Sequence, residues 1–260
     1  MKNFLLTFIL FLSFLQAENL GVNEKLGTTI PLDLTFLNEQ SKSVTLRKLM
    51  NGKPTLLSLN YFRCAGICTP QLNEMAKILS DVHLAENIDY KVITVDFAED
   101  ETVALACSKK KNILKSMSRP YVQDAWQFVI GENNSSNTLA KAVGFKYKTI
   151  TDKQGHIMGY LHAATIVVLS PTGKIVRYLR GVQQLSADVT LALQEAKEEK
   201  VSKSIAKDSP FCFTEKPTGD ILINKITKGW MAFMMLMVVG VLFYLLRGKK
   251  KPKEEEKKED

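Results

Sequence analysis

Apolar and polar positions follow two patterns along the middle of the chain, one typical of strands and one typical of helices. Short apolar runs rich in β-branched and aromatic residues predict strands at 32–37, 54–61, 90–97, 126–130, 163–169 and 175–179. Apolar positions three or four residues apart predict helices at 68–84, 102–114, 136–143 and 186–200. The turn sequence SPTGK at 170–174 indicates that the last two strands form an antiparallel hairpin.

This order of elements favours an α/β fold. Strands alternate with helices at first, and an antiparallel hairpin and a final helix follow, which together indicate a mixed central sheet flanked by helices. A thioredoxin-like domain has this order. We expect that domain to occupy residues 18–200, and the sequence contains no internal repeat.

The first residues of the chain have the layout of a secretory signal. Lys2 supplies a positive charge, an apolar stretch of about a dozen residues runs from Phe4 to Leu15, and Ala17 is a small residue suited to cleavage. The stretch is short for a bilayer span, although an uncleaved N-terminal anchor is the alternative. We therefore assign residues 1–17 to a signal peptide and expect the domain to be exported.

A second apolar segment lies near the C-terminus. No charged residue occurs from Trp230 to Leu246, and a cluster of basic residues follows directly. A buried helix of the domain is excluded because the segment has no polar face to meet water. We predict a linker at 201–227, a transmembrane helix at 228–246 and a charged cytoplasmic tail at 247–260. The domain would then lie on the periplasmic side of a bacterial inner membrane.

Composition narrows the classes of function. The net charge of +8 comes from lysines spread along the chain, with a cluster near its end, whereas a nucleic-acid reader concentrates basic residues on one face among aromatic residues. Four cysteines are too few for a small disulfide-stapled protein, and 45% hydrophobic residues are enough for a packed core. Nucleic acid is therefore not expected as a partner.

Two cysteines lie where the strand at 54–61 gives way to the helix at 68–84. Cys64 and Cys68 are four positions apart, which brings both sulfurs to one side of a helical path. The positive end of the helix favours thiolate over thiol, and two thiolates are soft donors that select Cu(I) or Zn²⁺. The plain alternative in an exported protein is a structural disulfide or two buried apolar cysteines.

A third metal donor would have to come from one of three histidines. His83 lies near the end of the helix that begins at Cys68, about four turns away, and is too far to reach. His156 lies in a polar loop between glycines, and His162 stands at the start of the apolar strand AATIVVLS. A histidine at a strand edge is more often a capping or otherwise satisfied residue than a ligand, so spacing alone leaves His162 undecided.

Four longer segments carry a more specific signal: YFRCAGICTPQL, VITVDFAEDET, WQFVIGENNSSNTLAKAVGF and HAATIVVLSPTGKIVRYLRG. Together they resemble the Sco/SenC family of copper-binding thioredoxin-like proteins, over about residues 26–197. The resemblance implies that Cys64, Cys68 and His162 bind copper. It also implies a metallochaperone that delivers Cu(I) to the dinuclear copper centre of cytochrome c oxidase subunit II during assembly of the respiratory complex.

The chain departs from the pattern of that family at two positions. Leu161 stands directly before the histidine where family members often have an acidic residue, which removes a hydrogen-bonding or charge partner of the ligand. Phe97 replaces the proline of a Val-Asp-Pro motif, although Asp96 matches. Asp96 is a candidate either for supporting the site or for capping the following helix.

The two remaining cysteines have less specific surroundings. Cys212 lies in SPFCFTEKPTGD ahead of the predicted membrane helix, an arrangement that resembles a membrane-tethered bacterial subgroup of the same family. It is either an extra thiol near the partner or copper, or an unpaired thiol of no consequence. Cys107 is expected to be a small buried core residue, and the sequence leaves open whether a disulfide joins the two.

A thiol–disulfide oxidoreductase is the main alternative function. Cys64 and Cys68 would form the redox pair, one attacking a disulfide of the oxidase subunit or another extracytoplasmic partner and the other resolving the mixed disulfide. However, the spacing is Cys-x3-Cys rather than Cys-x-x-Cys, and LHAAT has no proline where thioredoxins carry a cis-proline. A peroxidase on this fold would need a threonine before the cysteine, where Arg63 stands. We therefore expect a copper carrier rather than an enzyme.

Overall fold

The computed structural model describes residues 21–64, 66–98 and 100–206, together with residues 234, 235, 237, 238 and 240 near the C-terminus. The chain divides into two units, residues 1–212 and residues 213–260. The predicted signal peptide, the cytoplasmic tail and most of the predicted membrane helix lie outside the described residues. Within the described part of the chain, the helices are all too short or too polar to cross a membrane.

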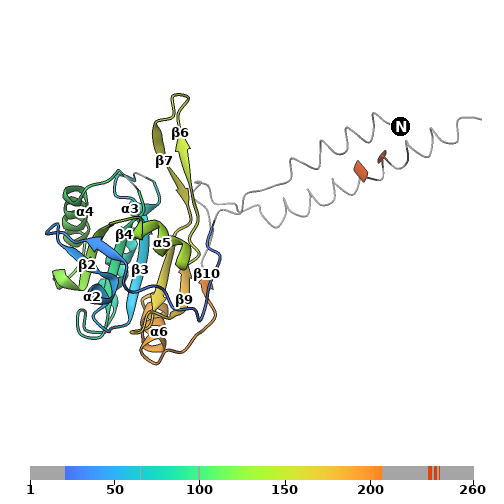
Figure 1. Ribbon diagram of the computed structural model, residues 1–260. Helices are drawn as coiled ribbons and strands as arrows, with labels where there is room; N and C mark the ends of the chain where they lie inside the picture. Colours follow the sequence, from blue (N-terminus) through green and yellow to red (C-terminus); the bar gives the residue numbers. More distant parts are fainter. Residues whose placement is uncertain are drawn as a thin grey trace, which may run out of the picture. The chain divides into compact units, whose positions relative to one another are not determined.

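An eight-stranded mixed sheet forms the centre of the first unit, with the strand order β10-β9-β8-β3-β4-β5-β1-β2 (Figure 1). The three middle strands β3, β4 and β5 are parallel, and β8 lies antiparallel to both β3 and β9. The bounds are β1 (Thr35–Leu37), β2 (Ser43–Thr45), β3 (Thr55–Asn60), β4 (Lys91–Asp96), β5 (Trp126–Gly131), β8 (Thr165–Leu169), β9 (Ile175–Arg180) and β10 (Ile205–Ala206).

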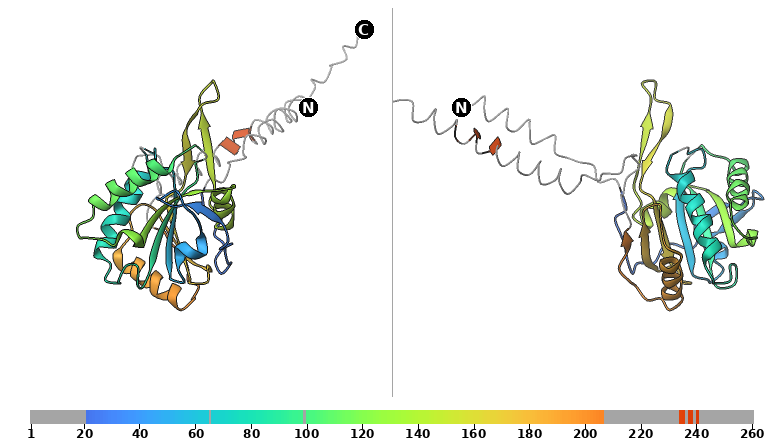
Figure 2. Two further views of the ribbon diagram at one scale, coloured as in Figure 1. Left: turned by 60° about the vertical axis from the view of Figure 1, so that its left-hand side comes forward. Right: turned by 180° about the vertical axis from the view of Figure 1, so that it is seen from behind.

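Helices cover both faces of this sheet, so β3 and β4 are buried along their whole length (Figure 2). This explains why these strands are almost continuously apolar instead of alternating with polar residues. One face packs against α3 (Cys68–Asp81), α4 (Val103–Lys115) and α6 (Ser186–Lys197). The other packs against α2 (Leu46–Met50) and α5 (Ser135–Ala142).

The six predicted strands and four predicted helices all occur, and the predicted turn at 170–174 joins β8 to β9 in an antiparallel pair. The predicted ends of α3 and α6, at 84 and 200, lie too far along the chain, because these helices end at Asp81 and Lys197. Two short elements, β2 and α2, were not predicted, nor was the one-turn η2 (Gln123–Ala125). Residues 205–206 of the predicted linker pair with β9 as strand β10, so the sheet extends into that segment.

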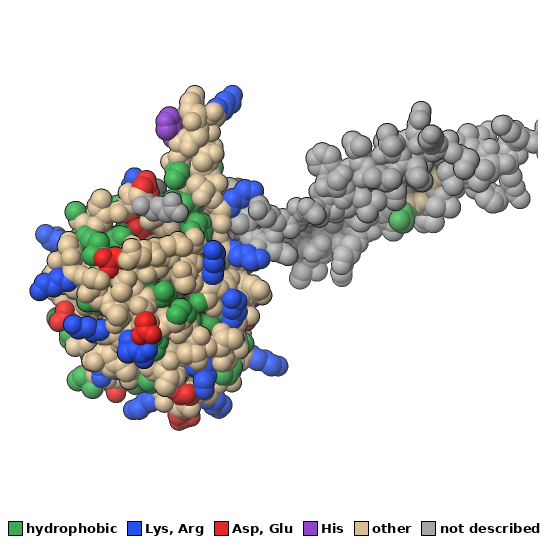
Figure 3. Space-filling view, in the orientation of Figure 1, with side chains coloured by type: hydrophobic (Ala, Val, Ile, Leu, Met, Phe, Trp, Pro, Cys, Tyr) green, Lys and Arg blue, Asp and Glu red, His purple; other side chains and the backbone are tan. Residues whose placement is uncertain are grey.

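A second sheet of two antiparallel strands, β6 (Tyr147–Thr151) and β7 (Ile157–His162), was also not predicted. It forms a hairpin that stands clear of the rest of the unit (Figures 1 and 3). Its outer part is exposed, including large apolar side chains such as Ile157 and Met158. Because neither face of its tip is buried, the hairpin lacks the apolar alternation by which strands are recognised in a sequence.

Candidate metal centre

The antiparallel pairing of β3 with β8 brings the two cysteines and one histidine to the same edge of the sheet. Ser58 of β3 lies opposite Ile166 of β8, so the C-terminal end of β3 is next to the N-terminal end of β8. Cys64 lies in the loop that follows β3, and Cys68 is the first residue of α3. His162 is the last residue of β7 and leads into β8.

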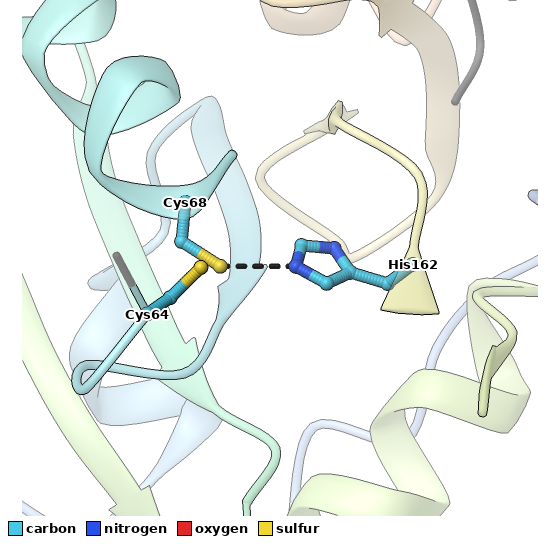
Figure 4. A group of neighbouring side chains, drawn as sticks. All are labelled: Cys64, Cys68 and His162. Atoms are coloured by element: carbon cyan, nitrogen blue, oxygen red, sulfur yellow. Dashed lines mark hydrogen bonds between the residues drawn. The ribbon is translucent and has the colours of Figure 1, made fainter. Parts of the chain in front are cut away.

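The three side chains converge on one point (Figure 4). The two Sγ atoms and a ring nitrogen of the histidine all lie within 4.8 Å of one another. Cys68 Sγ is 2.9 Å from His162 Nε2. All three residues are buried, with exposed fractions of 4% for Cys64, 0% for Cys68 and 1% for His162. This is the only group of three or more metal-ligating residues of the types Cys, His, Asp and Glu in the described part of the chain.

The orientation of the imidazole suits metal binding. Its Nδ1 lies 3.1 Å from the carbonyl oxygen of Ala163, which can only accept a hydrogen bond. The Nδ1 atom therefore carries the proton, and the lone pair of Nε2 points toward the sulfurs. A backbone carbonyl that fixes the tautomer in this way is a common partner of metal-binding histidines.

The two thiols are electrostatically different. A hydrogen bond from the Cys68 thiol, together with one from the Tyr61 hydroxyl, holds the pKa of Cys64 far below its usual value, despite the opposing effect of burial. Burial, followed by the neighbouring Cys64 sulfur, raises the pKa of Cys68. Cys64 and Cys68 are free cysteines, not joined in a disulfide. The site thus combines one thiolate, one thiol and one neutral imidazole whose Nε2 faces the sulfurs.

Aromatic rings surround the imidazole and exclude water from it. The ring centroids of Phe97, Phe145 and Tyr61 lie 5.1, 5.6 and 6.0 Å from that of His162. Tyr160 packs against both Tyr61 and Phe97 at 5.1 and 5.4 Å. These rings come from the loop after β3, the end of β4, the connection between α5 and β6, and the hairpin, so they connect the segments that carry the ligand atoms.

The comparison with family models decides the family. The SCO1/SenC model matches residues 24–196, which is well over half of the chain. The chain belongs to the SCO1/SenC family. No curated protein matches it in sequence.

Solved structures show that this SCO1/SenC protein shares its fold with distant relatives. A protein from Aquifex aeolicus VF5 is 24% identical, with a TM-score of 0.59, and the alignment covers 67% of this chain and 95% of that one. Copper-bound ScoI from Bradyrhizobium japonicum is 20% identical, with a TM-score of 0.50 and coverage of 66% and 99%. Copper-bound ScoI from Arabidopsis thaliana is 16% identical, with a TM-score of 0.51 and coverage of 67% and 99%. The predicted thioredoxin-like α/β fold is therefore confirmed as that of Sco proteins.

Several residues of the SCO1/SenC site that sequence reasoning missed hold the cysteines in place. The side chain of Gln71 accepts a hydrogen bond from Asn60 Nδ2 and donates one to the carbonyl of Thr165, both at 3.2 Å. It thereby joins α3 to the ends of β3 and β8. The Asn60 side chain also hydrogen-bonds Cys68. The buried carboxylate of Glu101 binds the loop ahead of Cys64. Of these residues, only Asn60 had a signal in the sequence, as a polar residue at the end of an apolar strand.

The other histidines lie away from this SCO1/SenC site, as predicted for His83. His83 is exposed after the end of α3. His156 is exposed at the far end of the hairpin, where its Nδ1 pairs with the Asp152 carboxylate at 2.9 Å. His162 itself does not begin the apolar strand as expected but ends β7, because the unpredicted hairpin precedes β8. Leu161 pairs with Lys148 across the hairpin, at the position where an acidic residue was expected.

Two further interpretations of the sequence were wrong. Asp96 does not cap α4, because Thr102 is the N-cap residue and its side chain accepts from the Leu105 amide. The Asp96 carboxylate instead accepts from the Ala98 amide at 2.9 Å. Cys107 is only partly buried rather than a core residue, since its helix turns this position toward a surface cavity. Cys212, the other half of the disulfide that the sequence left open, lies outside the described residues.

Proposed function

We propose that this SCO1/SenC protein is a copper carrier that binds Cu(I) through Cys64, Cys68 and His162. The observation that carries the proposal is the convergence of two sulfurs and the unprotonated Nε2 within 4.8 Å. Two thiolates and an imidazole are a soft donor set, and soft donors favour Cu(I). Copper is the cargo in this function, and the copper-bound ScoI structures of the same fold support the choice of metal.

The donor set also suits release of the ion. Three protein ligands leave room for a ligand from a partner, so the ion can be passed on by exchange of one donor at a time. Cys64 is already largely thiolate, whereas Cys68 must lose its proton when copper binds. Binding therefore releases protons, as is general for thiolate metal sites.

The proposed recipient is the dinuclear copper centre of cytochrome c oxidase subunit II or another extracytoplasmic copper protein. This assignment rests on the resemblance to the Sco/SenC family. We also propose that the domain is exported by the segment at 1–17 and tethered by a C-terminal helix at 228–246, with the copper site on the periplasmic side. The uncharged run from Trp230 to Leu246 and the basic cluster after it support the tether.

Copper titration of ligand variants tests the proposed function. The reduced full chain in mild detergent should bind about one Cu(I) per molecule, because one soft-donor site is present. Cys64→Ser and Cys68→Ser should abolish tight binding, since each removes a thiolate. His162→Ala should lower the affinity by roughly tenfold or more. Competition with a chromophoric Cu(I) chelator measures all of these affinities.

The other two histidines provide matched controls. His83→Ala and His156→Ala remove exposed imidazoles away from the site and should leave the Cu(I) affinity unchanged. An affinity of His162→Ala equal to that of the unmodified chain would remove the imidazole from the ligand set. Tight Cu(I) binding by both serine variants would refute the proposed function.

Thiol–disulfide exchange is a second candidate, and one observation favours it. A thiolate beside a protonated thiol is the arrangement needed for attack on a disulfide and resolution of the mixed disulfide. The oxidase subunit's copper-site cysteines would be the substrate. Efficient reduction of an oxidised copper-site peptide by the metal-free dithiol form, with no Cu(I) binding, would favour this function over copper transport.

A further inference from the structure

The loop that carries Cys64 has little support of its own. It connects β3 to α3, and α3 begins at Cys68 with Ile67 as the N-cap residue, which provides no side-chain hydrogen bond to the helix. Within the loop, the Cys64 amide donates to the Tyr61 carbonyl across a long 3.3 Å. The position of the Cys64 sulfur relative to Cys68 and His162 must therefore be fixed by contacts from other elements.

The first such contact is the carboxylate of Glu101, from the connection between β4 and α4. The side chain of Glu101 is fully buried, with an exposed fraction of 0%. One of its oxygens accepts from the Phe62 amide. The other accepts from the Arg63 amide at 2.8 Å and from Arg63 Nε at 3.2 Å. Two successive backbone N–H groups directly before Cys64 thus point at one buried charge, and charge-assisted bonds of this kind are strong.

The second contact comes from α4 and reaches Cys64 through α3. Lys109 Nζ donates to Thr69 Oγ1 at 2.9 Å. The Thr69 hydroxyl in turn donates to the carbonyl oxygen of Cys64 at 2.7 Å. The ammonium therefore polarises the hydroxyl that holds the Cys64 backbone from its other side.

We propose that Glu101 and Lys109 are positioning residues for the metal centre, which hold the Cys64 backbone from both sides so that its sulfur meets Cys68 and His162. This inference rests on the proposed copper function. Both residues come from the segment 101–109, and they act on the site through Phe62, Arg63 and Thr69. Residues that orient ligands in this way typically contribute about 10–100-fold to metal affinity.

The chain contains a matched control for a purely structural role. Glu39 is a second carboxylate, with a side chain only 10% exposed, that accepts from a backbone amide, that of Phe128, at 2.9 Å. It also pairs with Lys110 at 2.8 Å, the residue next to Lys109. These two residues are of the same types as the proposed clamp of Glu101 and Lys109, a carboxylate that accepts from a backbone amide and a lysine of α4, but they pair with each other and tie α4 to β5, not to the cysteine loop. Losing it should cost stability without displacing a ligand.

Four variants of the full chain compare the clamp residues, Glu101 and Lys109, with the control residues, Glu39 and Lys110. Glu101→Gln and Lys109→Met remove the charges of the clamp, and Glu39→Gln and Lys110→Met remove those of the control pair. We expect the Cu(I) affinity to fall by about 10–100-fold in the two clamp variants. We expect a change of less than about threefold in the control variants, because their contacts lie outside the site. Thermal unfolding of all four measures the loss of stability separately.

Two readouts respond to geometry rather than to stability. The sulfur-to-copper charge-transfer absorption of the Cu(II)-loaded protein should change in Glu101→Gln and remain unchanged in Glu39→Gln. Thr69→Val should lower the Cu(I) affinity as Lys109→Met does. Thr69→Ser should keep the affinity of the unmodified chain, because serine retains the hydroxyl that bonds the Cys64 carbonyl. The threonine variants also serve the test if Glu101→Gln does not fold.

The outcomes separate this inference from the proposed function. Wild-type affinity and absorption in Glu101→Gln or in Thr69→Val would overturn the positioning role. The role would also be overturned if the clamp and control variants lost Cu(I) affinity alike, each in proportion to its loss of stability. If the unmodified chain binds no Cu(I), the proposed function fails instead. The clamp is then tested by the equilibrium of the Cys64–Cys68 disulfide with glutathione, which should shift by about tenfold in Glu101→Gln but not in Glu39→Gln.

Discussion

At the scale of single residues, the site depends on what each neighbour does to the two sulfurs. The sequence indicates Cys64 and Cys68 because their spacing at the start of a helix is unusual and chemically meaningful. It does not indicate Tyr61, Glu101 or Gln71, because an aromatic, an acidic and an amide side chain have ordinary roles at such positions. Their importance comes from distances between segments far apart in the sequence, which no local pattern contains.

Tyr61 illustrates this point, and its hydroxyl can be tested alone. The hydroxyl hydrogen-bonds the Cys64 sulfur and helps to hold the pKa of that thiol low. Tyr61→Phe keeps the ring and removes the donor, so the pKa of Cys64 should rise by about one pH unit, the equivalent of one hydrogen bond. The ultraviolet absorbance of the thiolate as a function of pH measures this change in the reduced, metal-free chain.

A partly buried tyrosine elsewhere provides the control for that measurement. Tyr121 donates to the hydroxyl of Tyr90 at 3.2 Å and does not contact the thiols, so Tyr121→Phe should leave the titration unchanged. A titration of Tyr61→Phe that overlays that of the unmodified chain would show that the hydroxyl does not stabilise the thiolate.

At the scale of elements, the hairpin of β6 and β7 was the largest departure from expectation. The buried strands and the amphipathic helices were predictable because each has an apolar face that the core requires. The hairpin instead is exposed over most of its length, and only its base is partly buried. Its base nevertheless supplies Tyr160 and His162, so an element with no signal in the sequence positions one of the three proposed ligands.

Two glycines of the hairpin test whether its base orients the site. A Cβ atom added at Gly159 would lie 3.2 Å from the Tyr61 hydroxyl, whereas one at Gly155 would meet nothing within 4 Å. Both glycines have positive φ, at 154° and 88°, so alanine costs backbone energy at each, on the order of 1 kcal/mol. Gly159→Ala should also displace Tyr61 or β7 and lower the Cu(I) affinity, by up to about tenfold.

Gly155→Ala is the matched variant, and chelator competition measures both affinities. It should lose stability without losing affinity, since the tip of the hairpin is far along the strands from His162. Equal affinities for the two variants would show that close packing between Gly159 and Tyr61 does not influence the site.

At the scale of the whole first unit, the strand order creates the site. The strands were predictable one by one, but their order in the sheet was not, and only the placement of β8 beside β3 brings His162 to the cysteines. From the sequence, only the resemblance to the Sco/SenC family implies that His162 lies beside the two cysteines. One of the central strands, β4, ends at the site with a buried carboxyl group, that of Asp96. A buried carboxyl group can make the stability of the unit depend on pH.

Asp96, at the end of β4, is the residue through which this dependence should act. Asp96 is only 1% exposed. Burial and the nearby Glu101 carboxylate raise the pKa of Asp96 to about 8. The folded chain therefore keeps a proton on Asp96 that the unfolded chain releases near pH 4, so that the unfolding free energy falls as pH rises from about 4 to about 8.

Asp96→Asn removes this titration, so the unfolding free energies of the variant and of the unmodified chain should depend on pH in different ways. Asparagine remains neutral, so the unfolding free energy of the variant should exceed that of the unmodified chain by a margin that grows between about pH 4 and pH 8, by up to about 1.4 kcal/mol per pH unit, and then stays constant. Urea unfolding at a series of pH values measures the margin. Asp33→Asn, at an exposed carboxylate, should show no such growth. A margin independent of pH for Asp96→Asn would mean that the folded protein holds this carboxylate ionised, bound by a partner other than Glu101.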